Sequence, residues 1–429
     1  MANKFLQFWK LKDLRKKILL TVLLLVLVRL LAHIPVPGVD VEALQAFFKN
    51  SRLFGLMDVF AGGTMSRFSI AMMGVGPYIN ASIIAQLLTH VIPALENLQK
   101  EGGDEGRKKI SQYTRWLTVP LAILQAYGMT MLLKSQQAGD FFKDIQPTDL
   151  AMMMVVITAG TILMMWLGEL ITENGIGNGT SLIIALGIVA GLPSIIQNFQ
   201  AGYEGINSWM SIGGIILLSI VVITAIVYTN EGSRLIPVSY ARRVRGMRLY
   251  GGMDSHLPIK INVAGVIPII FAMSFMIFPS ILSQLFSNAR TEWIANVAKW
   301  MGEVLSLNPP TVWYIVAYFV LVMLFTFFYT SVIFNPKEIS ENIQKQGGFV
   351  PGIRPGSQTM QYLGFIINRL TASGAFFLAI IAVLPMLFGP TESFDTLIGG
   401  TSVLIIVSVV LETARQMKAQ IVMRSYDEY

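Results

Sequence analysis

The sequence predicts an all-α polytopic membrane protein with ten transmembrane helices. Of its 429 residues, 54% are hydrophobic and only 13% are charged, whereas a soluble domain carries about 25% charged residues. Apolar segments of roughly 20 residues, long enough to cross a bilayer as a helix, recur along the chain. The loops between them are alternately basic and nearly uncharged. The expected spans are residues 18–34, 68–92, 114–133, 150–171, 180–199, 211–229, 262–286, 311–334, 370–388 and 399–416.

The distribution of Lys and Arg predicts the orientation. Of the 32 basic residues, 24 lie before the first span, after the last, or in alternate loops, and 6 lie on the opposite side. Because basic short loops stay in the cytoplasm, we expect both termini there. The first span follows a basic segment but no small-residue cleavage site follows Leu31, so it is expected to be a retained anchor. The net charge of +7 favours contact with anionic membrane lipids; a docked nucleic acid or acidic partner is the alternative.

The spans divide into two groups of five, and an odd number places the two groups in opposite orientations, as in inverted repeats. We expect an N-terminal half, 1–200, and a C-terminal half, 201–429. Two cytoplasmic loops of the second half exceed simple connections. Loop 230–260 is arginine-rich and indicates a basic ribbon or hairpin, and in loop 335–369 Pro and Gly residues frame a tip that carries Arg354. Both loops could also be solvated segments without a partner.

A short apolar segment, Leu53–Phe60, precedes the second span and is followed by Gly62 and Gly63. It is too short to cross a membrane. A half-length helix at membrane depth must be buried in protein or face a cavity, because lipid cannot satisfy its exposed ends.

Signatures of catalysis and metal binding are missing from the sequence. There is no cysteine, the three histidines (His33, His90 and His256) are scattered, and no HExxH, GxSxG or phosphate-loop motif occurs. The glycines of 175–179 fit a tight turn better than a nucleotide site, because apolar helices flank them. We therefore expect no catalytic residue, no cofactor and no metal. Charged residues within spans are scarce: Glu169 and Glu412 fall near inner helix ends, which argues against an ion-coupled transporter.

The second span carries small and polar residues instead. Pro77 interrupts its backbone ladder, and Asn80, Ser82 and Gln86 would be costly against lipid. The seventh span repeats this character around Pro268. Two proline-broken spans at equivalent places in two halves indicate the central path, although ordinary packing of small residues is the alternative.

At these residues the chain closely resembles the SecY family, the central subunits of the bacterial protein-conducting channel. The most specific stretches are 53–88, 110–115, 168–193, 335–356 and 399–402. The resemblance implies a clamshell of two five-helix halves around a central hourglass pore, hinged between spans five and six. It also implies a plug helix near 53–64 and a lateral gate between spans two and three and spans seven and eight.

The resemblance also assigns residues to these parts. The apolar pore ring is Ile79, Ile83, Ile184, Ile270 and Ile405. The plug residues are Leu53, Phe54, Leu56, Met57, Val59, Phe60, Gly62 and Gly63. The lateral gate residues are Pro77, Asn80, Ser82, Gln86, Gln125, Asn262, Pro268 and Phe278. The docking residues for a motor or ribosome are Arg242, Arg243, Arg245, Arg248 and Arg354.

The implied function is passage of unfolded secretory polypeptides across the bacterial cytoplasmic membrane and lateral release of transmembrane segments into it. The implied partners are SecE, SecG, the SecA ATPase or the ribosome on the cytoplasmic face, signal sequences and unfolded precursors. A pore for unfolded chains needs no buried catalytic charge, and branched apolar side chains at a constriction can block ions by dewetting. A secondary transporter of a small solute is the alternative function, and an intramembrane enzyme ranks third.

Overall fold

The computed structural model describes residues 12–37, 41, 44–45, 63–135, 147–202, 206–240, 243–245, 248–250, 254–286, 291–305, 311–387 and 400–427. The predicted plug residues Leu53 to Gly62 and the predicted docking residue Arg242 lie outside this part of the chain.

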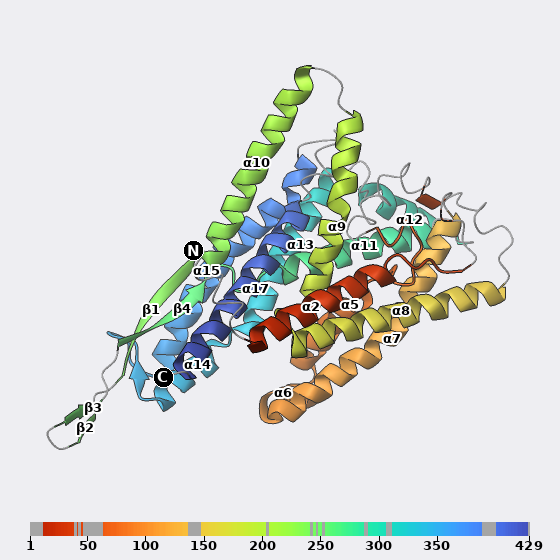
Figure 1. Ribbon diagram of the computed structural model, residues 1–429. Helices are drawn as coiled ribbons and strands as arrows, with labels where there is room; N and C mark the ends of the chain where they lie inside the picture. The colour runs from red at the N-terminus through yellow and green to blue at the C-terminus, as the bar shows by residue number, and fades with distance from the viewer. Residues whose placement is uncertain are drawn as a thin grey trace. The chain divides into compact units, whose positions relative to one another are not determined.

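Every predicted span coincides with a helix, which confirms the all-α prediction (Figure 1). The ten helices are α2 (Lys12–Leu31), α5 (Gly76–Val91), α7 (Gly103–Ser135), α8 (Pro147–Asn174), α9 (Gly179–Gly202), α10 (Ile206–Glu231), α11 (Ile267–Phe286), α13 (Val312–Ile333), α15 (Ser357–Leu387) and α17 (Gly400–Asp427). Among the described residues, shorter helices include α6 (Pro93–Glu101), α12 (Glu292–Val304) and α14 (Pro336–Lys345).

Length and composition identify a smaller set of membrane spans within the described residues. Three helical stretches are long and apolar enough: Thr148–Asn174, Val312–Lys345 and Ser357–Leu384. The pair α5 and α6, bent by 102°, can count as a fourth. The chain is therefore a multi-pass membrane protein, and the count of ten spans stays a prediction.

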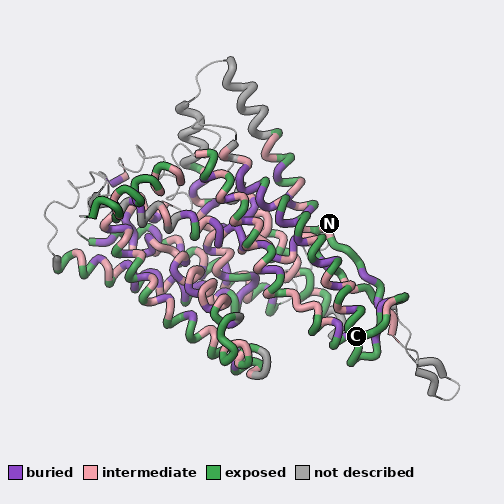
Figure 2. Tube along the Cα trace, turned by 180° about the vertical axis from the view of Figure 1, so that it is seen from behind, coloured by how far each residue is buried: buried purple, intermediate pink, exposed green. Residues whose placement is uncertain are grey.

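The chain packs as two compact units. The first comprises 1–212, 277–314 and 390–429, and the second comprises 213–276 and 315–389. In both, residues that face a neighbouring helix are buried and those on the outside of a helix are exposed (Figure 2). These units are defined by contacts between residues. The predicted halves were instead defined by the opposite orientations of two groups of five spans. The division at residue 200 therefore stays a prediction.

In the first unit, α8 packs against α2, α7 and α9, and α9 also packs against α17. One cluster of buried residues lies at the centre of these contacts. It consists of Leu24, Val28, Ala71, Val75, Met164, Leu167, Ile171 and Ile183.

The second predicted span starts later than expected. Residues 68–75 form turns, and the helix begins only at Gly76. Two left-handed residues interrupt a right-handed helix here: Phe68, fully buried with a φ of 45°, and Gly74, with a φ of 53°, two residues before the helix begins. The Phe68 carbonyl accepts a hydrogen bond from the Val36 backbone N–H at 2.9 Å. Burial of the ring and this hydrogen bond hold the unfavourable backbone in place.

The glycine-rich segment between α8 and α9 is a tight turn, as predicted. The Gly179 N–H donates to Thr172 Oγ1 at 2.9 Å. A Cβ atom on Gly179 would collide with the Gly168 carbonyl oxygen. Close approach of the two helices, not phosphate binding, therefore accounts for this glycine.

The second unit contains the predicted basic hairpin. Strands β1 (Ser233–Tyr240) and β4 (Asp254–Lys260) pair antiparallel, with Ser233 opposite Lys260. Beyond them, β2 (Arg243–Arg245) pairs with β3 (Arg248–Tyr250) (Figure 1).

A third strand, β5 (Gly348–Phe349), adds to β1 and gives the order β4-β1-β5. This edge strand brings loop 335–369 onto the hairpin of loop 230–260. A buried apolar cluster joins the sheet to the start of α15. Its members are Ile236, Ile259, Val350, Leu363, Ile366 and Ile367.

Candidate functional site

Helix α5, the predicted second span, begins at Gly76, directly after a run of turns. Pro77 stands in its first turn and is buried, and no side chain caps the helix at Val75. Proline suits this place, because it has no N–H that would need a partner and its φ is already helical. Pro77 therefore marks the start of the helix, close to the predicted ring residue Ile79, and does not interrupt the backbone ladder within a span as had been predicted.

The sides of α5 differ. Ala81 and Ala85 are buried, and these small residues allow the close contact between α5 and α7. Ile79, Asn80 and Ile83 are only partly buried. The polar and branched residues predicted to line the path therefore do not lie in the most tightly packed face of the helix.

The structure brings two predicted ring residues to one cluster. Ile79 of α5 and Ile184 of α9 both pack against the buried cluster centred on Leu167 and Ile171. Ile405 is buried on α17, which packs against α9. Ile270 belongs to the other compact unit. The common level of all five residues stays a prediction.

A charged group that sequence reasoning missed joins three helices. The Arg115 Nε of α7 donates to Glu169 Oε1 of α8 at 2.9 Å. Tyr78 of α5 hydrogen-bonds the same carboxylate through its side chain. The Glu169 side chain is 12% exposed and that of Arg115 is 44% exposed. Glu169 is therefore a mostly covered acceptor that ties α5 and α7 to α8, rather than a fully solvated residue at a helix end.

Asn262, a predicted gate residue, is held by three side-chain hydrogen bonds. Its Nδ2 donates to Asn230 Oδ1 at 2.9 Å and to the Gly265 carbonyl at 3.2 Å, and its Oδ1 accepts from the Gly265 N–H at 3.0 Å. These bonds stabilise the turn that precedes α11. Among the other gate residues, Pro268 is buried, Ser82, Gln86 and Gln125 are partly buried, and Phe278 lies in α11. Their role in a gate stays a prediction.

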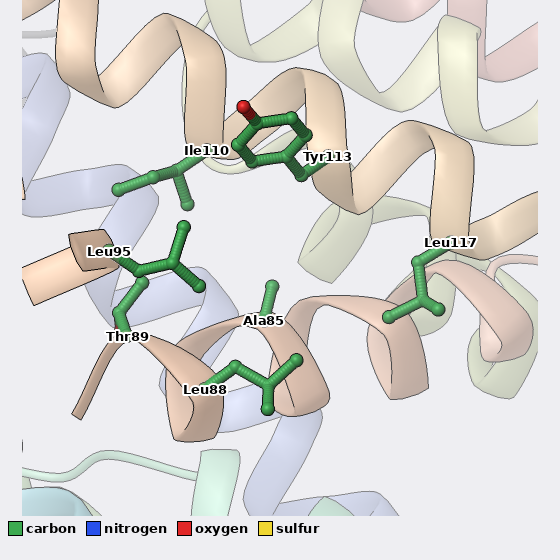
Figure 3. Close-up of a pocket in the computed structure, with 7 residues that line it drawn as sticks. All are labelled: Ala85, Leu88, Thr89, Leu95, Ile110, Tyr113 and Leu117. Atoms are coloured by element: carbon green, nitrogen blue, oxygen red, sulfur yellow. The ribbon is translucent and has the colours of Figure 1, made fainter. Parts of the chain in front are cut away.

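An apolar cavity of about 230 Å³ lies where α5 bends into α6, beside α7. Figure 3 shows side chains from the three helices around it. Its lining is Ala85, Leu88, Thr89, Leu95, Ile110, Tyr113 and Leu117. Thr89 donates its hydroxyl to the Gln86 carbonyl at 2.7 Å. A cavity with this lining accepts an apolar side chain or part of an acyl chain, and it does not present the converging polar groups of a catalytic pocket.

The predicted docking tip is a braced loop. Thr359 Oγ1 donates to the Arg354 carbonyl at 3.0 Å, and Ser340 Oγ donates to the Gly356 carbonyl at 2.8 Å. The Arg354 side chain is exposed. The loop therefore holds the backbone of Arg354 in one place while its guanidinium faces outward.

Arg243, Arg245 and Arg248 lie on β2 and β3, with Arg245 opposite Arg248 in the register. Of the predicted plug, the structure describes only Gly63, whose φ of 78° marks a turn. Within the described residues, no group of three His, Asp or Glu side chains could hold a metal ion.

The fold is that of protein-conducting channels. A structure described as that of a protein-conducting channel matches 94% of this chain and 91% of its own, with a TM-score of 0.62 and 19% identity. Sec61 from the canine ribosome–channel complex matches the same share of each chain, with a TM-score of 0.59 and 19% identity. At this identity the likeness concerns the fold alone.

Sequence relatives identify the family. The SecY family matches residues 69–414. The protein translocase subunit SecY of Streptomyces coelicolor is 42% identical over the whole of both chains. That of Aquifex aeolicus is 40% identical over all of this chain and 99% of its own. The chain therefore belongs to the SecY family. These relatives support the predicted channel and not the alternative of a solute transporter.

Proposed function

We propose that this chain forms the channel by which unfolded secretory polypeptides cross a bacterial cytoplasmic membrane, and from which transmembrane segments leave sideways into lipid. Full-length similarity to SecY translocase subunits carries this proposal. The packing of Ile79, near the start of α5, and of Ile184 against one apolar cluster supports a wall of branched apolar residues.

The proposed resting barrier is the apolar ring, which excludes ions because it offers water no hydrogen-bonding partner. The segment 53–63 is proposed to plug the opening. Lateral release would proceed past α5, whose partly buried Asn80 and Gln86 suit a surface that alternates between protein and translocating chain. No catalytic group is needed, so the driving force must come from a partner.

That partner is proposed to dock on the cytoplasmic loops. The exposed Arg354 and the arginines of β2 and β3 offer positive charge on a structured base, which suits carboxylates of a SecA motor or phosphates of a ribosome. Sec61 has been seen in a ribosome–channel complex. SecE and SecG are proposed as further subunits, with both termini of this chain on the docking side.

The test is reconstitution of the purified chain with SecE and SecG in vesicles, followed by addition of SecA, ATP and an unfolded precursor. The expected result is ATP-dependent protection of the precursor from external protease. A matched precursor without a signal sequence should remain exposed to the protease. Saturable uptake of a small solute without precursor protection would contradict the proposal and restore the transporter alternative.

A further inference from the structure

Helix α12, which the sequence did not predict, lies between α11 and α13 and is held by both. Ser283 Oγ of α11 donates to the Ala298 carbonyl of α12 at 2.7 Å. A Cβ atom on Gly302 would collide with the same Ser283 hydroxyl. At the other end, Thr311 Oγ1 donates to the Val304 carbonyl at 2.5 Å and accepts from the Tyr314 N–H at 3.2 Å. These contacts fix how α12 is rotated about its axis.

Helix α12 has three different faces, and these contacts determine which of them is turned toward α11. Small residues (Ala295, Ala298 and Gly302) form the face toward α11. Polar residues (Glu292, Asn296, Lys299 and Glu303) form a second, exposed face. Trp293, Val297 and Trp300, spaced by four and three residues, share a third face. Their exposed fractions are 73%, 44% and 63%, so this apolar face has no cover within the described residues of the chain.

Exposed apolar residues also follow α12 in the sequence, at the start of a membrane-spanning helix. Val312 and Trp313, the first two residues of α13, are 74% and 68% exposed. Residues 312–345 are among the stretches long and apolar enough to span a bilayer. Three of the seven tryptophans of the chain thus lie within residues 293–313, which include all of α12 and the start of α13.

The exposed tryptophans indicate that the apolar face of α12 contacts the membrane interface. Tryptophan is enriched at the boundary of headgroups and acyl chains, because its ring is apolar and its N–H still reaches a polar partner. A helix with one apolar and one polar face lies in the plane of that boundary. Two exposed tryptophans on α12 and a third, Trp313, at the start of a stretch able to span a bilayer favour lipid over a protein partner as the occupant.

We propose that α12 is an interfacial helix, whose Trp293, Val297 and Trp300 face enters the membrane leaflet on the side opposite the basic loops. It then fixes the depth of the adjoining ends of α11 and α13. The polar face of α12 carries one Lys and two Glu residues. Attraction to anionic headgroups therefore adds little, and the insertion rests on apolar area and on the tryptophans.

The absence of cysteine in the chain allows a direct test. Single cysteines at Trp293, Val297, Trp300, Lys299 and Glu303 are labelled with an environment-sensitive fluorophore in the full chain, reconstituted in phosphatidylethanolamine–phosphatidylglycerol vesicles. Nitroxide lipids labelled near the headgroup should quench the probes at 293, 297 and 300. Aqueous iodide should quench those at 299 and 303, with the 3.6-residue period of a helix. Lowering the phosphatidylglycerol fraction should leave this pattern unchanged.

A second measurement keeps one native anchor, Trp300, as the probe. In a variant that retains Trp300 while the six other tryptophans become Phe, nitroxide lipids should quench the native indole and iodide should not. Equal quenching of all five cysteine sites by iodide, or iodide quenching of Trp300, would overturn the proposal. Iodide access in vesicles of the chain alone, with protection appearing only in native membranes, would show that a protein covers the face and would equally overturn it.

Discussion

The ion pair that joins α7 to α8 should respond unequally to loss of its two members. Arg115→Gln leaves the Glu169 carboxylate, 12% exposed, with the Tyr78 side chain as its remaining charge-stabilising contact. Glu169→Gln leaves the Arg115 guanidinium, 44% exposed, which can turn to water or to lipid headgroups. An unpaired buried charge costs more than an unpaired exposed one.

The magnitudes follow from this difference in burial. Loss of a hydrogen bond to a charged group costs about 1.5–3 kcal/mol, and we expect Arg115→Gln to cost about 2 kcal/mol. A half-exposed pair contributes about 0–1 kcal/mol, so Glu169→Gln should cost less than about 1 kcal/mol. The double variant should be close to Glu169→Gln, because the carboxylate that needs a partner is then absent.

The order of stability is measured by heating the purified variants in one mild detergent. The readout is the temperature at which the peak of the folded monomer is lost. Ser181→Ala in the partly buried start of α9 is a control for handling and should unfold like the unchanged chain. Tyr78→Phe should be destabilised less than Arg115→Gln, since it removes a neutral donor. If Glu169→Gln proved less stable than Arg115→Gln, the assignment of Glu169 as the more covered member would be wrong.

Three further predictions concern the turn, the docking tip and the plug. Gly179→Ala should destabilise the chain by about 1–3 kcal/mol through its collision with Gly168, whereas Gly128→Ala, with open space around it, should be neutral in the same unfolding assay. Arg354→Glu should abolish SecA-driven protection of a precursor while membrane insertion is retained; normal protection would end the docking assignment. Deletion of 55–63 should raise resting ion conductance in planar bilayers, and an unchanged conductance would exclude a plug role.

Local patterns predicted much of the fold. Apolar length predicted a helix in each of the expected spans, and the arginine-rich composition of loop 230–260 indicated its hairpin. Both features depend on neighbours in sequence. The late start of α5 was missed, because the left-handed backbones of Phe68 and Gly74 depend on the tertiary structure, such as the hydrogen bond from Val36 to Phe68. Helix α12 was missed because its 13 residues are too short and too mixed for a span.

The site was less predictable than the fold. Glu169 and Arg115 are 54 residues apart in sequence, and single-sequence patterns do not indicate which charged residues of different spans will pair. A glutamate near the end of one span and an arginine at the start of another are the only local signals. The roles of the pore ring and the plug came from family resemblance. The sequence of a membrane helix does not show which of its isoleucines line a constriction.

The central claim is that branched apolar side chains, rather than a charged or catalytic site, close the channel. Ion conductance of Ile405→Asn and Ile405→Leu, measured in the same planar bilayer and at the same number of channels, tests it most directly. The amide gives water a hydrogen-bonding partner at the constriction and leucine does not. We predict a raised resting conductance for Ile405→Asn and a conductance like that of the unchanged chain for Ile405→Leu. Equal conductance of the two variants would contradict the claim and show that Ile405 is an ordinary packing residue.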